Sequence, residues 1–245
     1  MTALVYLRFY GSIFQQTGKS LLKAWWVALL PIALSFALRL VVLRLFALIP
    51  SPQIVGFAVG LLYDAALSSY FYFLANAVEG SPVSLREFPL SFRAYFWPII
   101  SVYFVYFIAS LLLGAVVRGA EQGGAILIGL ELVAFIAFNA APEVLYQQRS
   151  TGRGLATLQT AFKFLQENLL TWGIPNVLIA GGLYFLLGPG LSAFAADTRT
   201  MGMQLWELPV LAVFVHVLMV FRGHLFKALA GSSHRQRMFK FRNAA

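Results

Sequence analysis

Six long apolar runs, separated by short polar segments, follow one another along the chain. Each run is close to the roughly 20 residues with which an α-helix crosses about 30 Å of hydrocarbon. The runs cover residues 25–49, 54–78, 96–117, 124–141, 170–187 and 208–229. The pattern predicts an all-α polytopic membrane protein with six transmembrane helices, which short connections join into three hairpins.

Two further segments are amphipathic. In residues 154–168, apolar positions recur in steps of three and four, whereas Lys163 and Glu167 fall on the other side. This apolar stripe consists of Leu155, Leu158, Phe162, Leu165 and Leu169. Residues 2–18 mix apolar side chains with Arg8 and glutamines, and are too polar to span. We expect both segments to form interfacial helices in the headgroup layer.

The composition supports one membrane domain over residues 1–230, followed by a basic tail at 231–245. Of the 245 residues, 60% are hydrophobic and 11% charged, against roughly 45–50% and about 25% in soluble domains. The lack of cysteine excludes disulfides, iron–sulfur clusters and thiolate metal sites. Motifs of proteases, hydrolases and nucleotide-binding loops are also missing. We therefore expect a protein that is not an enzyme and that uses no metal or cofactor.

The charge distribution predicts both the orientation and the lipid contacts. The net charge is +9, and the basic residues flank apolar runs, which favours anionic lipid headgroups over nucleic acid. If both termini are cytoplasmic, only Arg118 and Arg199 lie on the outer side, as the positive-inside rule requires. The cytoplasmic side then holds Arg8, Arg86 and Arg93, together with ten residues predicted to contact headgroups: Lys19, Lys23, Arg149, Arg153, Lys163, Lys227, Arg235, Arg237, Lys240 and Arg242.

Among the charged residues inside the predicted spans, Arg39 and Asp64 are the best candidates for an ion pair. Folding the first two spans about the turn at residues 50–52 puts both residues at similar depth, because each lies ten positions from its span end. A charge at a span centre costs about 2.5–3.5 kcal/mol, so an intramembrane ion pair between them is expected. Such a pair can fix the register of the hairpin, or it can couple protons or anchor an anionic substrate.

Other polar residues inside the predicted spans are scattered over separate helices. Arg44 is close enough to the outer face to snorkel. Glu131 either reaches Arg118 or Arg44, or stays protonated. His216 is predicted to pack inside the helix bundle, and Arg222 lies in the last span. Gly56 and Gly60 form a GxxxG pattern that allows close helix approach.

The stretch from residue 141 to 176 suggests a family. A Pro-Glu-Val-Leu exit from one span is followed by a polar turn and by ATLQTAFKFLQENLLTW, which leads into the next span. This arrangement resembles uncharacterised bacterial six-span proteins related to the membrane domain attached to some glycerophosphodiester phosphodiesterases. The resemblance implies a helical protein of the bacterial cytoplasmic (inner) membrane. It carries over no catalytic residue, because the phosphodiesterase barrel is absent.

These observations favour a non-enzymatic accessory or membrane-organising protein. It is expected to engage anionic lipid and either a partner membrane protein or further copies of itself. The alternative is a small secondary transporter, or a transporter subunit, that uses the intramembrane residues Arg39, Asp64 and Glu131. An intramembrane enzyme is the third reading.

Overall fold

The computed structural model describes residues 3–117, 123–148, 153–196, 207–232 and 236. All secondary structure within these residues is helical, so the predicted all-α class is confirmed. The elements are α1 (Ala3–Lys23), η1 (Trp25–Leu29), α2 (Leu30–Leu48), α3 (Pro52–Glu79), η2 (Leu85–Glu87), α4 (Phe88–Ala94), α5 (Phe96–Val117), α6 (Gly123–Ala137), α7 (Ala141–Gln147), α8 (Gly154–Ala196) and α9 (Glu207–Ala230).

Five helical segments are long and apolar enough to cross a membrane. They are Trp25–Leu48, Pro52–Glu79, Leu85–Val117, Gly123–Gln147 and Ala212–Ala230. Each overlaps one of the predicted spans, so the chain has the composition and helix lengths of a multi-pass membrane protein. The remaining predicted span, residues 170–187, lies within α8. A total of six spans, their pairing as three hairpins and the cytoplasmic termini stay predictions.

The first amphipathic segment is longer than expected. The predicted helix at residues 2–18 corresponds to α1, which runs on to Lys23. Its apolar side buries Phe9 and Ile13, in a cluster that also contains Phe221 of α9. The helix is therefore packed against the protein body on one side and exposed on the other.

The second amphipathic segment forms the start of α8 and ends at a break. Asn168, with φ −128° and ψ 18°, is non-helical inside α8, so the break falls at the predicted end of residues 154–168. The predicted apolar stripe is only partly buried, since Leu155, Phe162 and Leu169 are exposed. The buried face is rotated toward Ala161 and Phe164, which lie in the protein core. The spacing of apolar residues at three and four positions predicts the helix, but it does not predict which side of that helix packs against the protein body.

The core lies where α1, α7, α9, the second half of α3 and the start of α8 meet. Two clusters of buried apolar side chains fill this body. Helix α9 contributes to both, with Val220 in one cluster and Phe221, Leu225, Phe226 and Leu229 in the other. Because α9 is apolar around most of its circumference, it can pack against several helices at once.

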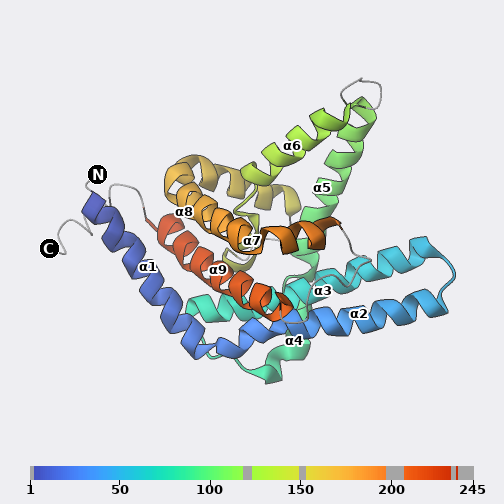
Figure 1. Cartoon of the computed structure of the whole chain (residues 1–245), viewed down its shortest axis with the longest axis horizontal. Coiled ribbons are helices and arrows are strands. Elements are labelled where there is room, and N and C mark those ends of the chain that lie inside the picture. The colour runs from blue at the N-terminus through green and yellow to red at the C-terminus, as the bar shows by residue number, and fades with distance from the viewer. Residues whose placement is uncertain (1–2, 118–122, 149–152, 197–206, 233–235, 237–245) are drawn as a thin grey trace.

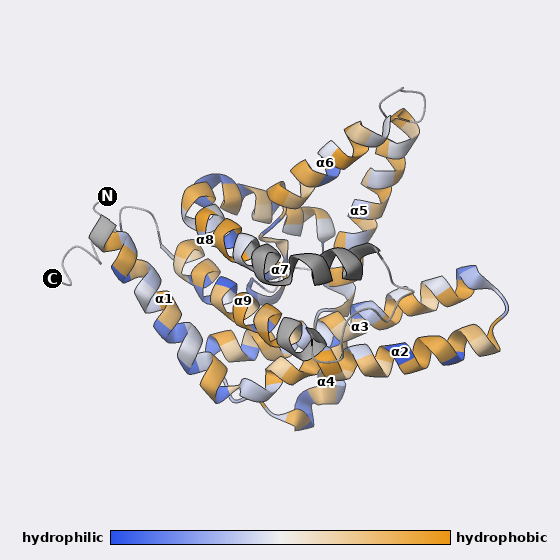
Figure 2. Cartoon of the chain, in the orientation of Figure 1, coloured by the Kyte–Doolittle hydropathy of each residue, from blue (hydrophilic) through white to orange (hydrophobic). Residues whose placement is uncertain are grey.

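Two hairpins project away from this body (Figure 1). One consists of α2 and the first half of α3, and the other of α5 and α6. Within α5 only Ile99 and Val117 are buried, and none of the described residues of α6 is buried. Most of the surface of these hairpins is apolar (Figure 2). An apolar surface of this extent belongs in contact with lipid or with another protein.

Candidate functional site

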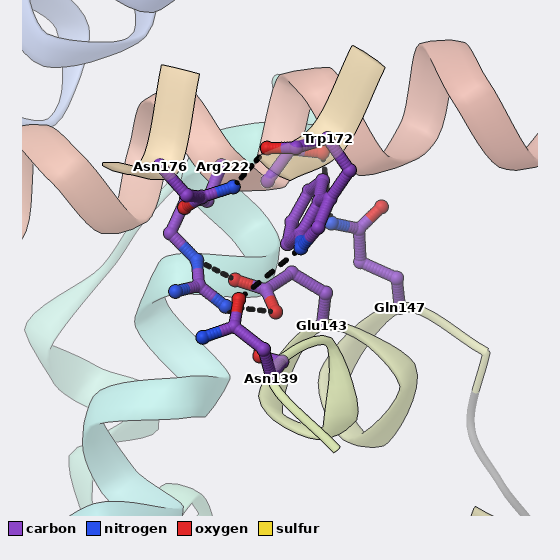
Figure 3. Close-up of polar contacts among 7 residues, drawn as sticks. Asn139, Glu143, Gln147, Trp172, Asn176 and Arg222 are labelled. Atoms are coloured by element: carbon purple, nitrogen blue, oxygen red, sulfur yellow. Dashed lines mark hydrogen bonds and ion pairs between the residues drawn. The ribbon is translucent and has the colours of Figure 1, made fainter. Parts of the chain in front are cut away.

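The most constrained polar residues are Glu143 of α7 and Arg222 of α9. Helix α7 starts at Ala141, has Pro142 near its N-terminus and places Glu143 in its first turn, where a carboxylate is favoured by the helix dipole. The Glu143 side chain is fully buried, and the Arg222 side chain is 11% exposed. Arg222 Nε lies 2.7 Å from Glu143 Oε1, and Nη2 lies 2.8 Å from Oε2. The two side chains thus form a bidentate, charge-assisted pair (Figure 3).

Helix α8 and the connection between α6 and α7 complete this cluster. Arg222 Nη2 also donates to the carbonyl of Asn139 at 2.6 Å, and the Asn139 side-chain oxygen accepts from Trp172 Nε1 at 3.1 Å. The guanidinium lies 5.1 Å from the centre of the Trp172 ring, in cation–π range. Asn176 Nδ2 donates to the Trp172 carbonyl at 2.6 Å. One arginine therefore connects three separate parts of the chain.

Neighbouring contacts hold α7 against α3, against α9 and against Tyr95, the residue between α4 and α5. Gln147 Nε2 donates to the carbonyl of Gly223 at 2.9 Å, and Tyr95 Oη donates to the carbonyl of Tyr146 at 3.0 Å. A Cβ atom at Gly223 would lie 2.6 Å from a Val78 methyl and 2.7 Å from the Tyr146 hydroxyl. Glycine at this position thus allows α9 to approach both α3 and α7.

Two buried histidines attach α9 to other helices. His216 Nδ1 lies 3.2 Å from the Tyr70 hydroxyl of α3, and His224 Nε2 lies 2.9 Å from the Ser20 hydroxyl of α1. His216 is packed inside the protein body, as its sequence position indicated. These hydrogen bonds join helices far apart in the sequence. Ser20 and His224 are a hydroxyl and an imidazole in contact, but within the described residues His224 Nδ1 has no hydrogen-bond partner, so no third group orients the imidazole as a catalytic base requires.

Arg39 and Asp64 are not brought together. Within the described ranges the recorded salt bridge is that of Arg222 with Glu143, and Arg39 forms none with Asp64. Arg39 is exposed on α2, whereas Asp64 is half-buried on α3. Counting residues from the turn gives the position of each residue along its helix. It does not give the direction in which the side chain points around the helix axis.

Arg44 and Glu131 are exposed on the two projecting hairpins. Neither has a salt-bridge partner in the part of the chain that the structure describes. Arg118, one of the partners considered for Glu131, lies outside the described residues.

The ten predicted headgroup residues divide into two groups. Lys19, Lys23, Arg153, Lys163 and Lys227 are all exposed, and Lys23 Nζ also donates to the carbonyl of Gly80. The other predicted headgroup residues lie outside the described ranges and are Arg149, Arg235, Arg237, Lys240 and Arg242. Lipid contact at either group stays a prediction.

The described side chains of the buried cluster are suited to fixing helices rather than to chemistry. Both carboxylate oxygens of Glu143 accept hydrogen bonds from one cation, so its charge is neutralised in place. Among residues 3–117, 123–148, 153–196, 207–232 and 236, no group of three or more His, Asp or Glu is placed to hold a metal ion.

Glu143 is the residue that sequence reasoning missed. It lies in the Pro-Glu-Val-Leu exit that follows the apolar run at residues 124–141, so the pattern of spans does not include it among the intramembrane charges. The signal was present, because Arg222 lies seven positions before the end of its predicted span at residue 229 and had no assigned partner. Comparison of the chain with protein-family models, with curated proteins and with solved structures finds no match.

Proposed function

We propose that this protein is a non-enzymatic, membrane-organising component of the bacterial cytoplasmic membrane. Its basic surface residues hold anionic lipid, and its projecting hairpins associate with a membrane protein. The observation that carries the proposal is the contrast between a body fixed by buried polar contacts and two apolar hairpins with almost no buried side chains. Such hairpins present far more apolar surface than their own chain covers.

The exposed basic residues support the lipid part of the proposal. Lys19 and Lys23 lie near the end of α1 and Lys227 near the end of α9, while Arg153 immediately precedes α8 and Lys163 lies in its first part. Each is worth about 1 kcal/mol near an anionic bilayer surface. The exposed apolar residues Leu155 and Phe162 share α8 with Lys163 and follow Arg153 closely, the composition of an interfacial helix.

A transport function receives less support from the geometry. Transport along one path requires the intramembrane charges to face a common cavity. Arg39, Asp64 and Glu131 instead lie on α2, α3 and α6, and the first and last of them are exposed on different hairpins.

Neutralising three exposed lysines is expected to remove the preference for anionic lipid. The variant combines Lys19→Gln, Lys163→Gln and Lys227→Gln, and it keeps Lys23, which bonds to the backbone at the end of α3. Each substitution should lower the preference for phosphatidylglycerol over phosphatidylethanolamine about fivefold. Native mass spectrometry of protein purified with a defined mixture of these two lipids measures the bound ratio.

The matched control replaces the same three lysines with arginine, which keeps the charge and should keep the lipid ratio. Equal phosphatidylglycerol enrichment in the wild type and the glutamine variant would contradict the lipid part of the proposal. For the protein-association part, the chain is extracted from its own membranes in mild detergent. A chain that appears only as a monomer would contradict that part.

A further inference from the structure

We infer that the protein with which the hairpins associate is a second copy of this chain, and that Arg39 of each copy pairs with Glu131 of the other. The inference rests on the proposed function, because it identifies the membrane-protein partner proposed there. It also assigns a role to two charges that the buried cluster of α7, α8 and α9 does not use.

Arg39 lies in the middle of an exposed apolar stripe on α2. Phe36, three positions before it, is 50% exposed, and Leu43, four positions after it, is 61% exposed. Residues three and four apart share one face of a helix. Since no described residue forms a salt bridge with Arg39, an isolated monomer would present an unpaired cation to the hydrocarbon.

Glu131 has the same kind of surroundings on α6. Ile128, three positions before it, and Phe135, four positions after it, are both 69% exposed. In the described part of the chain, the Glu131 carboxylate likewise has no salt-bridge partner. The two stripes are thus alike in their apolar flanks and opposite in the charge at their centre.

The two charges also lie at similar distances from the tips of their hairpins. Arg39 is nine residues before the end of α2 at Leu48, and Glu131 is eight residues after the start of α6 at Gly123. At 1.5 Å per residue, these positions are about 13.5 Å and about 12 Å from the ends of their helices at the hairpin tips. Two membrane crossings, α3 and α5, separate the tips. Both tips therefore lie on the same side of the membrane, whichever way the chain is oriented.

A second copy fits this arrangement better than the same chain does. Figure 1 shows α2 and α6 on separate hairpins that diverge from the body, so the two helices of one chain do not lie side by side. A two-fold axis along the membrane normal keeps the depth of every residue and sets α2 of each copy against α6 of the other. The resulting dimer is closed and contains two identical ion pairs.

The α2–α3 hairpin also offers room for a close neighbour. At Gly56 and at Gly60 of α3, an added Cβ would meet nothing within 4 Å, so the chain itself does not use this GxxxG pattern. Small residues of this kind allow a helix from another chain to approach the backbone.

Disulfide cross-linking tests the contact without changing any charge. The natural chain has no cysteine, so two differently tagged copies are expressed together, one with Leu43→Cys and the other with Ile128→Cys. Leu43 is five residues before Leu48 and Ile128 five residues after Gly123. We expect a disulfide-linked dimer that carries both tags. Dimers linked only through like positions, or no dimer, would overturn the inference.

The matched control pairs Ile128→Cys with Leu22→Cys. Leu22 is 81% exposed but lies on α1, outside the proposed contact, and should give no dimer carrying both tags. Equal cross-linking of this control would also overturn the inference, because it would report random collision.

Charge exchange tests the ion pair itself. Glu131→Arg alone should lower the dimer fraction in lipid nanodiscs about tenfold, because it sets like charges against each other. Combining it with Arg39→Glu restores opposite charges and should restore the dimer. Glu167→Arg on α8 is the matched control and should leave the dimer unchanged. A dimer that is unaffected by Glu131→Arg would overturn the inference. It would also be overturned if the combined charge-exchange variant stays monomeric and the two cysteine-containing chains fail to cross-link.

Wild-type protein extracted from its own membranes, together with the lipid measurement described above, separates failure of this inference from failure of the proposed function. Wild-type protein that is enriched in phosphatidylglycerol and bound to a different membrane protein, without cross-links between copies, would overturn the second copy as partner and retain the proposed function. Protein without lipid preference and without any protein partner would overturn both.

Discussion

Replacing Glu143 with alanine is expected to cost about 3–5 kcal/mol of stability, the range for breaking a buried ion pair by removing one partner. The substitution leaves the guanidinium of Arg222 buried beneath Trp172 with only the Asn139 carbonyl as an acceptor. An uncompensated charge in such surroundings is the largest single penalty that the described residues offer. Thermal unfolding of the purified protein, followed by tryptophan fluorescence, should show a melting temperature lower by about 10 °C.

Two further variants show whether the loss comes from the unpaired charge. Glu167→Ala removes an exposed carboxylate from α8 and should change the melting temperature little. Replacing Glu143 and Arg222 together with methionine removes both charges and keeps most of the side-chain volume, so this double variant should lose less stability than Glu143→Ala. A double variant less stable than the single one would mean that Arg222 acts mainly through Trp172 and Asn139.

The apolar pattern predicted the helices well, because the bilayer requires long, uninterrupted apolar segments and few other segments can satisfy that requirement. The runs at residues 54–78 and 96–117 correspond closely to α3 and α5. The pattern also located the point inside α8 where the amphipathic segment ends and the apolar run begins, which is where Asn168 interrupts the helix. What it did not predict is a body in which α9 packs against several helices while two hairpins project from it.

The partners of charged residues were harder to predict. Arg39 and Asp64 lie on consecutive spans joined by a tight turn, and their positions along the two helices can be counted directly from that turn. The pair that forms, Glu143 with Arg222, joins residues 79 positions apart, and one of them lies on a seven-residue helix. Counting residues gives depth alone, whereas pairing also depends on helix rotation and on which helices are neighbours.

Close backbone contacts are another feature that composition does not reveal. Gly154 starts α8 at a point where it meets α5, and nothing in its surrounding sequence distinguishes it from Gly173 of the same helix. An added Cβ at Gly154 would lie 2.1 Å from the Ser101 carbonyl oxygen and 2.8 Å from the Val102 nitrogen. Both are backbone atoms, so no side chain can rotate away to make room.

Gly154→Ala is therefore expected to destabilise the protein by about 3 kcal/mol, at the upper end of the usual cost of overpacking. The α8 N-terminus must move away from α5, which separates the amphipathic helix from the base of the α5–α6 hairpin. Gly173→Ala is the matched control, because its Cβ would meet nothing within 4 Å and alanine is about 1 kcal/mol more favourable than glycine in a helix. The two variants should shift the melting temperature in opposite directions. Equal shifts would mean that α8 is not held against Ser101, and the attachment of the α5–α6 hairpin to the body would then have to lie in its contacts with α3 and α4.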